Sequence, residues 1–210
     1  MTAAAEGHRY EVLSRQERFH GLLFDVVTDD VTMPGGGRAH RDYLRHVGAV
    51  GVVALDGDGR VVLVHQYRHA VAQVLWELPA GLVDVPGEAS VGTAQRELAE
   101  EADLRADRWD LLVDLYTSPG CSTELFRAFL ARDLHPVPDD ERHERHDEEA
   151  ELTVRLVDLD EAVAMIFRGE ILNGPTVAAL LAAASARDGG WATLRPAQTP
   201  RPPTPRTAPA

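Results

Sequence analysis

The sequence contains no lysine, so all 21 of its basic residues are arginine. This excludes Schiff-base catalysis by a lysine amine and the phosphate-binding lysine of a P-loop. A single cysteine, Cys121, cannot form an internal disulfide or a site built from several thiolates. The sequence has neither the roughly 18 consecutive apolar residues of a membrane span nor the apolar run of a signal peptide. We therefore expect a cytoplasmic protein that does not enter a membrane.

Acidic residues outnumber basic residues by 34 to 21, which gives the chain a formal net charge of -13 at pH 7. A surface of this charge repels the phosphate backbone of nucleic acids, so we expect no nucleic-acid partner. An anionic small molecule would need a local cluster of arginines or metal ions that neutralise it. Of the 210 residues, 44% are hydrophobic, which is enough for the core of a folded domain.

Proline is unevenly distributed, with six of its 13 positions in the last fifteen residues. Paired glycines precede this stretch at 189 and 190, and no hydrophobic periodicity runs through it. Such a composition is typical of an extended or disordered segment without a packed core. The sequence therefore predicts a folded part at roughly 8–186 and a disordered, proline-rich tail at 187–210.

Apolar and alternating patterns divide the folded part into strands and helices. Strands are predicted in part of 10–30 and at 46–55, 61–67, 75–78, 111–116, 125–131 and 151–157. Helices are predicted at 90–102, 160–168 and 174–186, and turns at 33–37 and 56–59. Because several strands follow one another through hairpin turns, we expect an α+β fold with a mixed β-sheet rather than a doubly wound parallel sheet.

Three glutamates, Glu97, Glu100 and Glu101, fall on one side of the predicted helix at 90–102. Each pair of like charges at this spacing costs about 0.2–0.5 kcal/mol, and acidic groups in the last turn also oppose the helix dipole. A solvated acidic face is one explanation. A bound cation is the other, and a site made only of carboxylates selects Mg²⁺ or Mn²⁺. Because Mg²⁺ is commonly shared with substrate phosphates, the second explanation points to phosphate-ester or pyrophosphate chemistry.

The residues around this helix favour the second explanation. Glu88 is followed by seven residues and then by Arg96-Glu97-Leu98-Ala99-Glu100-Glu101. This segment resembles the signature of the Nudix hydrolase family at every position from Glu88 to Glu101. So many matches at fixed spacing make a chance agreement improbable.

Two positions depart from that signature. Six residues rather than five separate Gly81 from Glu88, which places Leu82 in the column of the signature's first glycine. Asp103 stands where the signature has a second glycine, which would end the helix in a left-handed conformation. Asp adopts that conformation more readily than most residues, at some cost. Neither departure removes a carboxylate.

The resemblance implies the Nudix fold, an α/β/α sandwich with a mixed β-sheet, preceded by an N-terminal β-strand extension. It also implies a divalent metal cofactor, Mg²⁺ or alternatively Mn²⁺. The metal ligands that it implies are Glu97, Glu101, Glu100 and the backbone carbonyl of Ala80. The residues that would hold the loop and the helix together are Gly81, Glu88 and Arg96.

Segments outside the signature resemble the ADP-ribose pyrophosphatase branch of the family. They are Met33–Gly37, His46–Val50, Gln66–His69, Trp76–Gly81 and Ser118–Glu124, with Pro119 sixteen residues after Asp103. The branch implies metal-dependent hydrolysis of ADP-ribose to AMP and ribose 5-phosphate. The substrate contacts that we assign on this basis are Arg68, Arg41 and Leu82.

An acidic run at 139–151 precedes the predicted strand at 151–157. A solvated, mobile loop is the simplest explanation. The branch carries its catalytic base on this loop, so we assign the base to Glu149, with Glu148 as the alternative. Glu101 completes the set of expected catalytic residues.

We therefore expect three regions: an N-terminal strand extension at 1–45 that mediates dimerisation, a Nudix hydrolase domain at 46–186, and the tail at 187–210. The resemblance implies a homodimer and a small-molecule nucleoside diphosphate sugar as the substrate. Two alternatives stay open. The substrate could be another nucleoside diphosphate sugar or nucleotide derivative, or the domain could be a ligand sensor that keeps the fold without catalysis.

Overall fold

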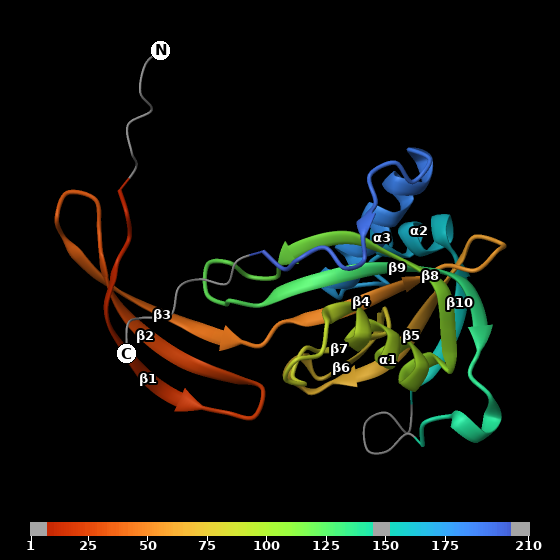
Figure 1. Cartoon of the computed structure of the whole chain (residues 1–210), viewed down its shortest axis with the longest axis horizontal. Helices are drawn as coiled ribbons and strands as arrows, with labels where there is room; N and C mark the ends of the chain where they lie inside the picture. The colour runs from red at the N-terminus through yellow and green to blue at the C-terminus, as the bar shows by residue number, and fades with distance from the viewer. Residues whose placement is uncertain (1–7, 145–151, 203–210) are drawn as a thin grey trace, which may run out of the picture. The chain divides into compact units, whose positions relative to one another are not determined.

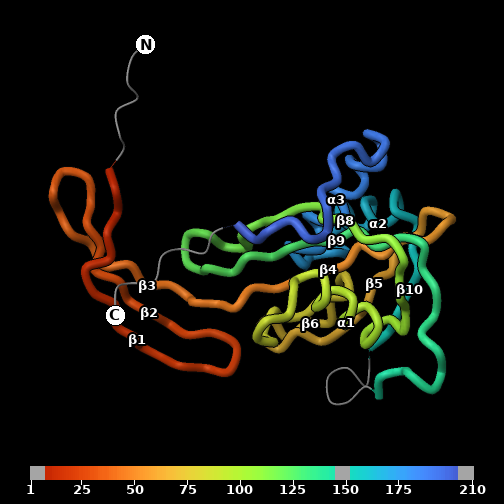
Figure 2. Tube along the Cα trace, in the orientation of Figure 1, coloured from red at the N-terminus to blue at the C-terminus, as the bar shows by residue number. Residues whose placement is uncertain are grey.

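The computed structural model of the chain describes residues 8–144 and 152–202. These residues form two compact units. The first unit contains residues 8–47, 118–124 and 201–202, and the second contains residues 48–117, 125–144 and 152–200. Figure 2 follows the chain from the first unit, in red and orange, into the second.

The first unit is an antiparallel sheet of three strands in the order β1-β2-β3 (Figure 1). Its strands are β1 (Val12–His20), β2 (Phe24–Thr32) and β3 (Arg38–His46). The turn between β2 and β3 contains Gly35 and Gly36, which both have a φ of 83° and so adopt a backbone conformation that favours glycine. Residues 118–124 join the sheet through hydrogen bonds between Leu44 and the backbone of Cys121 and Thr123.

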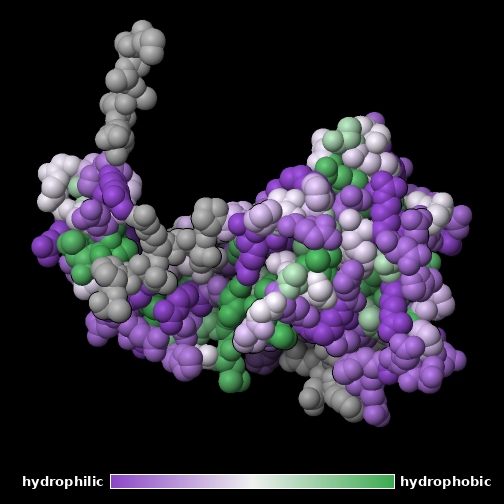
Figure 3. All heavy atoms as spheres, viewed as in Figure 1, coloured by the Kyte–Doolittle hydropathy of each residue, from purple (hydrophilic) through white to green (hydrophobic). Residues whose placement is uncertain are grey.

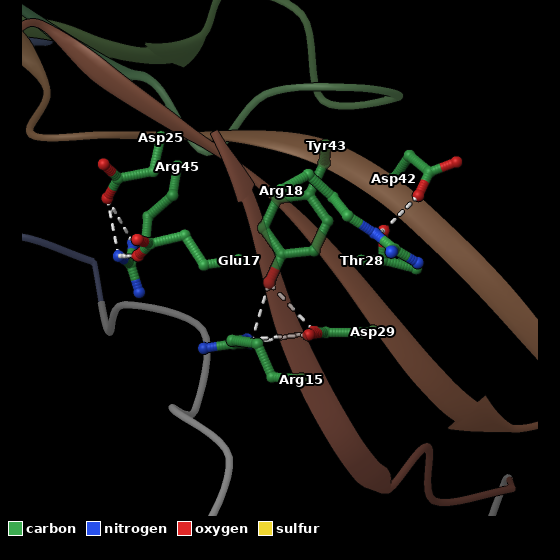
Figure 4. Close-up of polar contacts among 9 residues, drawn as sticks. All are labelled: Arg15, Glu17, Arg18, Asp25, Thr28, Asp29, Asp42, Tyr43 and Arg45. Carbon is green, nitrogen blue, oxygen red and sulfur yellow. Dashed lines mark hydrogen bonds and ion pairs between the residues drawn. The ribbon is translucent and has the colours of Figure 1, made fainter. Parts of the chain in front are cut away.

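One carboxylate in this sheet is almost fully buried and is held by a polar network (Figure 4). Arg15 donates hydrogen bonds to both oxygens of Asp29, at 2.7 and 2.8 Å, and the hydroxyl of Tyr43 donates to Asp29 at 2.9 Å. The hydrogen bonds from Arg15 lower the pKa of Asp29. The buried carboxylate is therefore stabilised in its charged form.

The second unit contains a five-stranded sheet in the order β11-β8-β9-β4-β7 and a three-stranded sheet in the order β10-β5-β6. The strands are β4 (Ala49–Ala54), β5 (Arg60–Arg68), β6 (Gln73–Glu77), β7 (Ala80–Leu82), β8 (Leu104–Tyr116), β9 (Leu125–Pro136), β10 (Thr153–Asp158) and β11 (Arg195–Pro196). Strands β4 and β9 are parallel, whereas the other pairs among the described strands are antiparallel.

Helices cover both faces of these sheets. The helices are α1 (Ser90–Ala102), α2 (Leu159–Phe167) and α3 (Gly174–Asp188), with short 3-10 turns η1 (His69–Val71) and η2 (Asp139–Glu141). Val53 and Leu63 pack in one core cluster with α2 and α3, whereas Val52 and Val62 pack in a second cluster with α1. Neighbouring residues of β4 and β5 thus point to opposite helical layers, as strand geometry requires. The predicted α+β sandwich with a mixed sheet is confirmed.

The proline-rich end of the chain differs from its prediction. Helix α3 continues to Asp188, and β11 pairs with β8 at the edge of the five-stranded sheet. The buried guanidinium of Arg127 donates to the backbone carbonyl of Thr199 at 2.9 Å, and Ala197 is buried. The expectation of a disordered tail from 187 is therefore wrong for 187–202, whereas 203–210 lie outside the described residues. A proline-rich composition does not exclude these contacts, because proline is tolerated in an edge strand such as β11, which pairs with β8 on one side.

Hydrophilic side chains cover most of the face shown in Figure 3. Hydrophobic side chains form patches on this face, including the part formed by β1–β3. Phe19, Leu22 and Leu23 are exposed at the turn between β1 and β2. No helix in the described part of the chain is long and apolar enough to cross a membrane.

Candidate active site

Helix α1 carries the acidic residues predicted to bind metal. Its opposite side is apolar, and Ala94, Leu98 and Ala102 are buried in the core cluster beneath it. The helix ends at Asp103, which has φ 53° and ψ 36° and whose N–H is directed to the carbonyls of Leu98 and Ala99. The left-handed helix end predicted for this position is therefore present without the glycine that would favour it.

The glutamates on α1 differ in exposure although they share one side of the helix. Glu101 is only 5% exposed, and its Oε2 accepts a hydrogen bond from the backbone N–H of Ala80 at 2.9 Å. The side chain of Glu97 is 12% exposed, and that of Glu100 is 29% exposed. These carboxylates therefore do not form an ordinary solvated helix face, because two of them are largely removed from water.

Gly81 allows Glu97 to lie against the main chain of β7. A Cβ atom built on Gly81 would overlap the carboxylate of Glu97. Gly81 is held in place by pairing between β7 and β4, where it faces Val50. The missing side chain therefore brings a carboxylate and bare backbone into contact at the edge of the sheet.

Arg96 lies among the carboxylates. Its Nη1 is 2.7 Å from Oε1 of Glu97 and 3.0 Å from Oε2 of Glu100, and its Nη2 is 3.6 Å from Oε2 of Glu88. Burial lowers the pKa of the Arg96 guanidinium, but the charges of the surrounding glutamates raise it more, so its pKa lies above the ordinary value. One guanidinium thus faces three carboxylates, so negative charge remains for a cation to neutralise.

Glu88 connects the loop before α1 to the first turn of the helix. The hydroxyl of Thr93 donates to its Oε2 at 2.9 Å, and its backbone N–H bonds to the carbonyl of Val85 at 3.1 Å. Gly87 has a φ of 83° in the same turn. This geometry matches the predicted role of Glu88 in holding the loop on the helix.

The donor set fits a hard divalent cation. Around Glu97, Glu100 and Glu101 the ligand atoms are carboxylate oxygens, next to the bare backbone of Ala80 and Gly81. Oxygen ligands of this kind suit Mg²⁺ and Mn²⁺. The structure thus places Glu97 and Glu101 against the backbone of β7, and Arg96 links Glu97 to Glu100 on α1. Metal binding by these residues stays a prediction.

Among the described residues, Glu17, His20 and Asp25 of the first unit form a group of metal-ligating side chains whose ligand atoms lie within 4.8 Å of one another. Arg45 forms ion pairs with both Glu17 and Asp25 (Figure 4). Hydrogen bonds from Arg45 and then from His20 lower the pKa of Asp25. These contacts join the carboxylates of the cluster in an ion-pair network with Arg45.

Arg68 was predicted to contact substrate, and the structure shows how it is held. Its Nε and Nη2 donate to both oxygens of Glu77, at distances between 2.7 and 3.2 Å. Glu77 is only 2% exposed, whereas the side chain of Arg68 is 43% exposed. A buried carboxylate thus orients a half-exposed guanidinium. The sequence signal for Glu77 was an acidic residue between apolar neighbours, which requires a partner when buried.

The remaining predicted residues fall elsewhere. Leu82 is half-buried and packs against the core cluster, and its expected substrate contact stays a prediction. Arg41 lies on β3 in the first unit, where its Nη1 donates to the backbone carbonyl of His40 at 2.9 Å. Glu148 and Glu149 lie outside the described residues. The substrate role of Arg41 and the choice of base stay predictions.

The sequence and the fold of this chain are similar to those of known proteins. The family model of the NUDIX domain matches residues 45–180. The chain is 44% identical over 192 residues to an ADP-ribose pyrophosphatase of Mycobacterium tuberculosis, an alignment that covers 91% of each protein. It is 31% identical to an ADP-ribose pyrophosphatase of Bacillus subtilis, with 81% of this chain and 90% of that protein covered. A crystal structure of an ADP compounds hydrolase has the same fold, with a TM-score of 0.75, 20% identity, and coverage of 89% of this chain and 98% of that one.

Proposed function

Because this chain belongs to the NUDIX domain family, we propose that it is a metal-dependent pyrophosphohydrolase that cleaves ADP-ribose into AMP and ribose 5-phosphate. The observation that carries this proposal is the contact of Glu97 and Glu101 with the backbone of Gly81 and Ala80. The relative at 44% identity, which is named for this activity, supports the choice of substrate.

Glu97 and Glu101 would be the main ligands of Mg²⁺ or Mn²⁺, assisted by Glu100 and by the backbone carbonyl of Ala80. When bound, the ions would neutralise the diphosphate and lower the pKa of the attacking water. Arg96 pairs with Glu97 and Glu100 on α1 and would hold these two carboxylates close together.

Two other side chains of the second unit would complete the reaction. Arg68, oriented by Glu77, would bind the diphosphate, because a guanidinium presents paired donors to phosphate oxygens. Glu149, or alternatively Glu148, would accept the proton of the attacking water. Both glutamates belong to the acidic run at 139–151, which precedes β10 in the sequence.

The proposal extends to assembly and location. Exposed Phe19, Leu22 and Leu23 on the first unit support a homodimer formed through the strand extension, because large exposed apolar side chains are typical of protein interfaces. Arg41 on β3 would then contact substrate held by the partner subunit. We also expect the enzyme to be cytoplasmic.

Product analysis tests this function. Purified protein is incubated with Mg²⁺ and ADP-ribose, or with other nucleoside diphosphate sugars, and the products are identified by chromatography. We expect AMP and ribose 5-phosphate in equal amounts, and no turnover after chelation of the metal. Faster cleavage of another sugar would change the substrate, and no cleavage of any would favour the ligand-sensor alternative.

A further inference from the structure

The segment Leu78–Ala80 leads from β6 into β7 and contains Ala80, whose backbone carbonyl is a proposed metal ligand. Three of its backbone groups are each held by a different element. The N–H of Leu78 bonds to Oγ1 of Thr176 on α3 at 3.1 Å, and the carbonyl of Pro79 bonds to the N–H of Val52 on β4 at 2.9 Å. The N–H of Ala80 bonds to Glu101 on α1. The loop is thus fixed from both helical layers and from the sheet between them.

Thr176 is the contact that links α3 to this loop across 98 positions of the chain. It is only 2% exposed, and Leu78 is also buried, so no bulk water can replace the hydroxyl as an acceptor. Asn173 caps α3 and accepts the N–H of Thr176 at 2.9 Å, which fixes the first turn of the helix. The β-branched side chain of Thr also has few rotamers, so its hydroxyl is held in one direction.

We propose that Thr176 is a positioning residue for the metal site, acting through the backbone of Leu78–Ala80. This inference rests on the proposed function, because it takes Glu101 and the carbonyl of Ala80 as metal ligands. Without the hydroxyl, the buried N–H of Leu78 has no acceptor, and the loop moves to find one. Because Ala80 follows two residues later and is bonded to Glu101, that movement displaces both ligands together.

A merely structural role for Thr176 makes a different prediction. In that case its loss weakens the attachment of α3 to the sheet and lowers stability, but the metal ligands keep their arrangement. Leu180→Val provides the matched control, because Leu180 is buried on the same helix and packs in the core cluster. Both Thr176→Val and Leu180→Val should lower the unfolding temperature, whereas only the first should change metal binding.

The experiment measures Mn²⁺ binding by electron paramagnetic resonance without substrate, using wild type, Thr176→Val, Thr176→Ser and Leu180→Val. We expect Thr176→Val to weaken Mn²⁺ binding about tenfold, as changes that support metal ligands commonly do. Thr176→Ser keeps the hydroxyl and should bind as wild type does. In turnover assays, Thr176→Val should lower kcat and require more Mg²⁺ for half-maximal rate, with little change in KM for ADP-ribose.

Wild-type Mn²⁺ affinity in Thr176→Val would overturn the inference, as would an equal loss in Leu180→Val. Should Thr176→Val not fold, Thr176→Ala takes its place with the same expected loss of Mn²⁺ affinity. A wild-type protein that binds no Mn²⁺ would overturn the proposed function and this inference together. Normal binding by wild type and by every variant would overturn this inference alone.

Discussion

At the level of single residues, the site depends on a side chain that is missing. The carboxylate of Glu97 occupies the space that a Cβ on Gly81 would need. Neither residue can move easily, because Gly81 is paired with β4 and Glu97 belongs to a helix whose other side is buried. The identity of one glycine thus determines where a proposed metal ligand lies.

We expect Gly81→Ala to weaken Mn²⁺ binding by about tenfold or more, because the added methyl group displaces Glu97 from β7. Calorimetric titration with Mn²⁺ measures the loss. Gly57→Ala is the matched control, since that glycine lies in a hairpin turn with open space around its Cβ position. Unchanged affinity in Gly81→Ala would show that Glu97 does not need its place against the backbone.

The Arg68–Glu77 pair gives a second prediction at this scale. Arg68→Met leaves the buried carboxylate of Glu77 without its guanidinium, so we expect a loss of about 1–3 kcal/mol in the free energy of unfolding. The double variant Arg68→Met/Glu77→Leu removes both charges and should recover most of that stability. Urea denaturation measures both values.

Steady-state kinetics separates the two roles of Arg68. If the guanidinium binds diphosphate, KM for ADP-ribose rises in the double variant although its stability is restored. A double variant with wild-type KM would limit Arg68 to a structural role.

At the level of elements, α1 ends at Asp103, where the family signature has a glycine. Asp103 adopts a left-handed conformation that costs a non-glycine residue energy. We expect Asp103→Gly to raise the free energy of unfolding by about 0.5–1 kcal/mol without changing turnover. Asp103→Ala, which lacks the local hydrogen bonds of Asp, should be less stable than wild type. Equal stabilities in all three proteins, measured in urea, would contradict this account of the helix end.

The C-terminal segment provides a prediction for a whole element. A chain ending at Pro202 keeps all described residues at this end and serves as the reference. A chain ending at Gly190 loses β11, the burial of Ala197 and the acceptor of Arg127. We expect that deletion to lower the free energy of unfolding by about 2 kcal/mol or more, because the buried guanidinium of Arg127 keeps Asp114 but loses its second acceptor, and the edge strand is lost. Equal thermal stability of the two truncated chains would show that the segment does not contribute to the fold.

Elements with a clear apolar pattern could be predicted from the sequence, and elements defined by pairing could not. The apolar run around Val50 and Val52 predicted β4, and the period of Ala94 and Leu98 predicted α1. Strand β3 was not predicted, because its exposed charged side chains hide its alternation and its regularity comes from pairing with β2. Strand β11 was not predicted either, because its two residues form a strand only through pairing with β8.

At the scale of the whole molecule, some features of the site could also be predicted from the sequence and others could not. The signature placed Glu97, Glu100 and Glu101 on one side of a single helix, because they lie within one and a half turns of α1. The role of Thr176 could not be predicted, since its partner is 98 positions away and the contact is to a backbone N–H. Contacts to backbone leave no pattern in side-chain identities, so only the folded structure shows them.

The net charge of the whole chain affects binding of the proposed substrate. The chain carries a formal charge of -13, and its proposed substrate is an anion, so binding requires a local reversal of the field. Within the described site, Arg96 is surrounded by glutamates and Arg68 is paired with Glu77. Divalent ions held by α1 would supply the missing positive charge, which makes the metal ligands the central claim.

The most direct test of this claim is the rate of Mg²⁺-dependent ADP-ribose hydrolysis in Glu97→Gln and Glu101→Gln. Glu161→Gln, which changes an exposed carboxylate on α2, is the control. We predict that both site variants fold, lose about a thousandfold in kcat and no longer bind Mn²⁺, whereas the control keeps wild-type values. Wild-type turnover in both folded variants would contradict the assignment of these carboxylates as metal ligands.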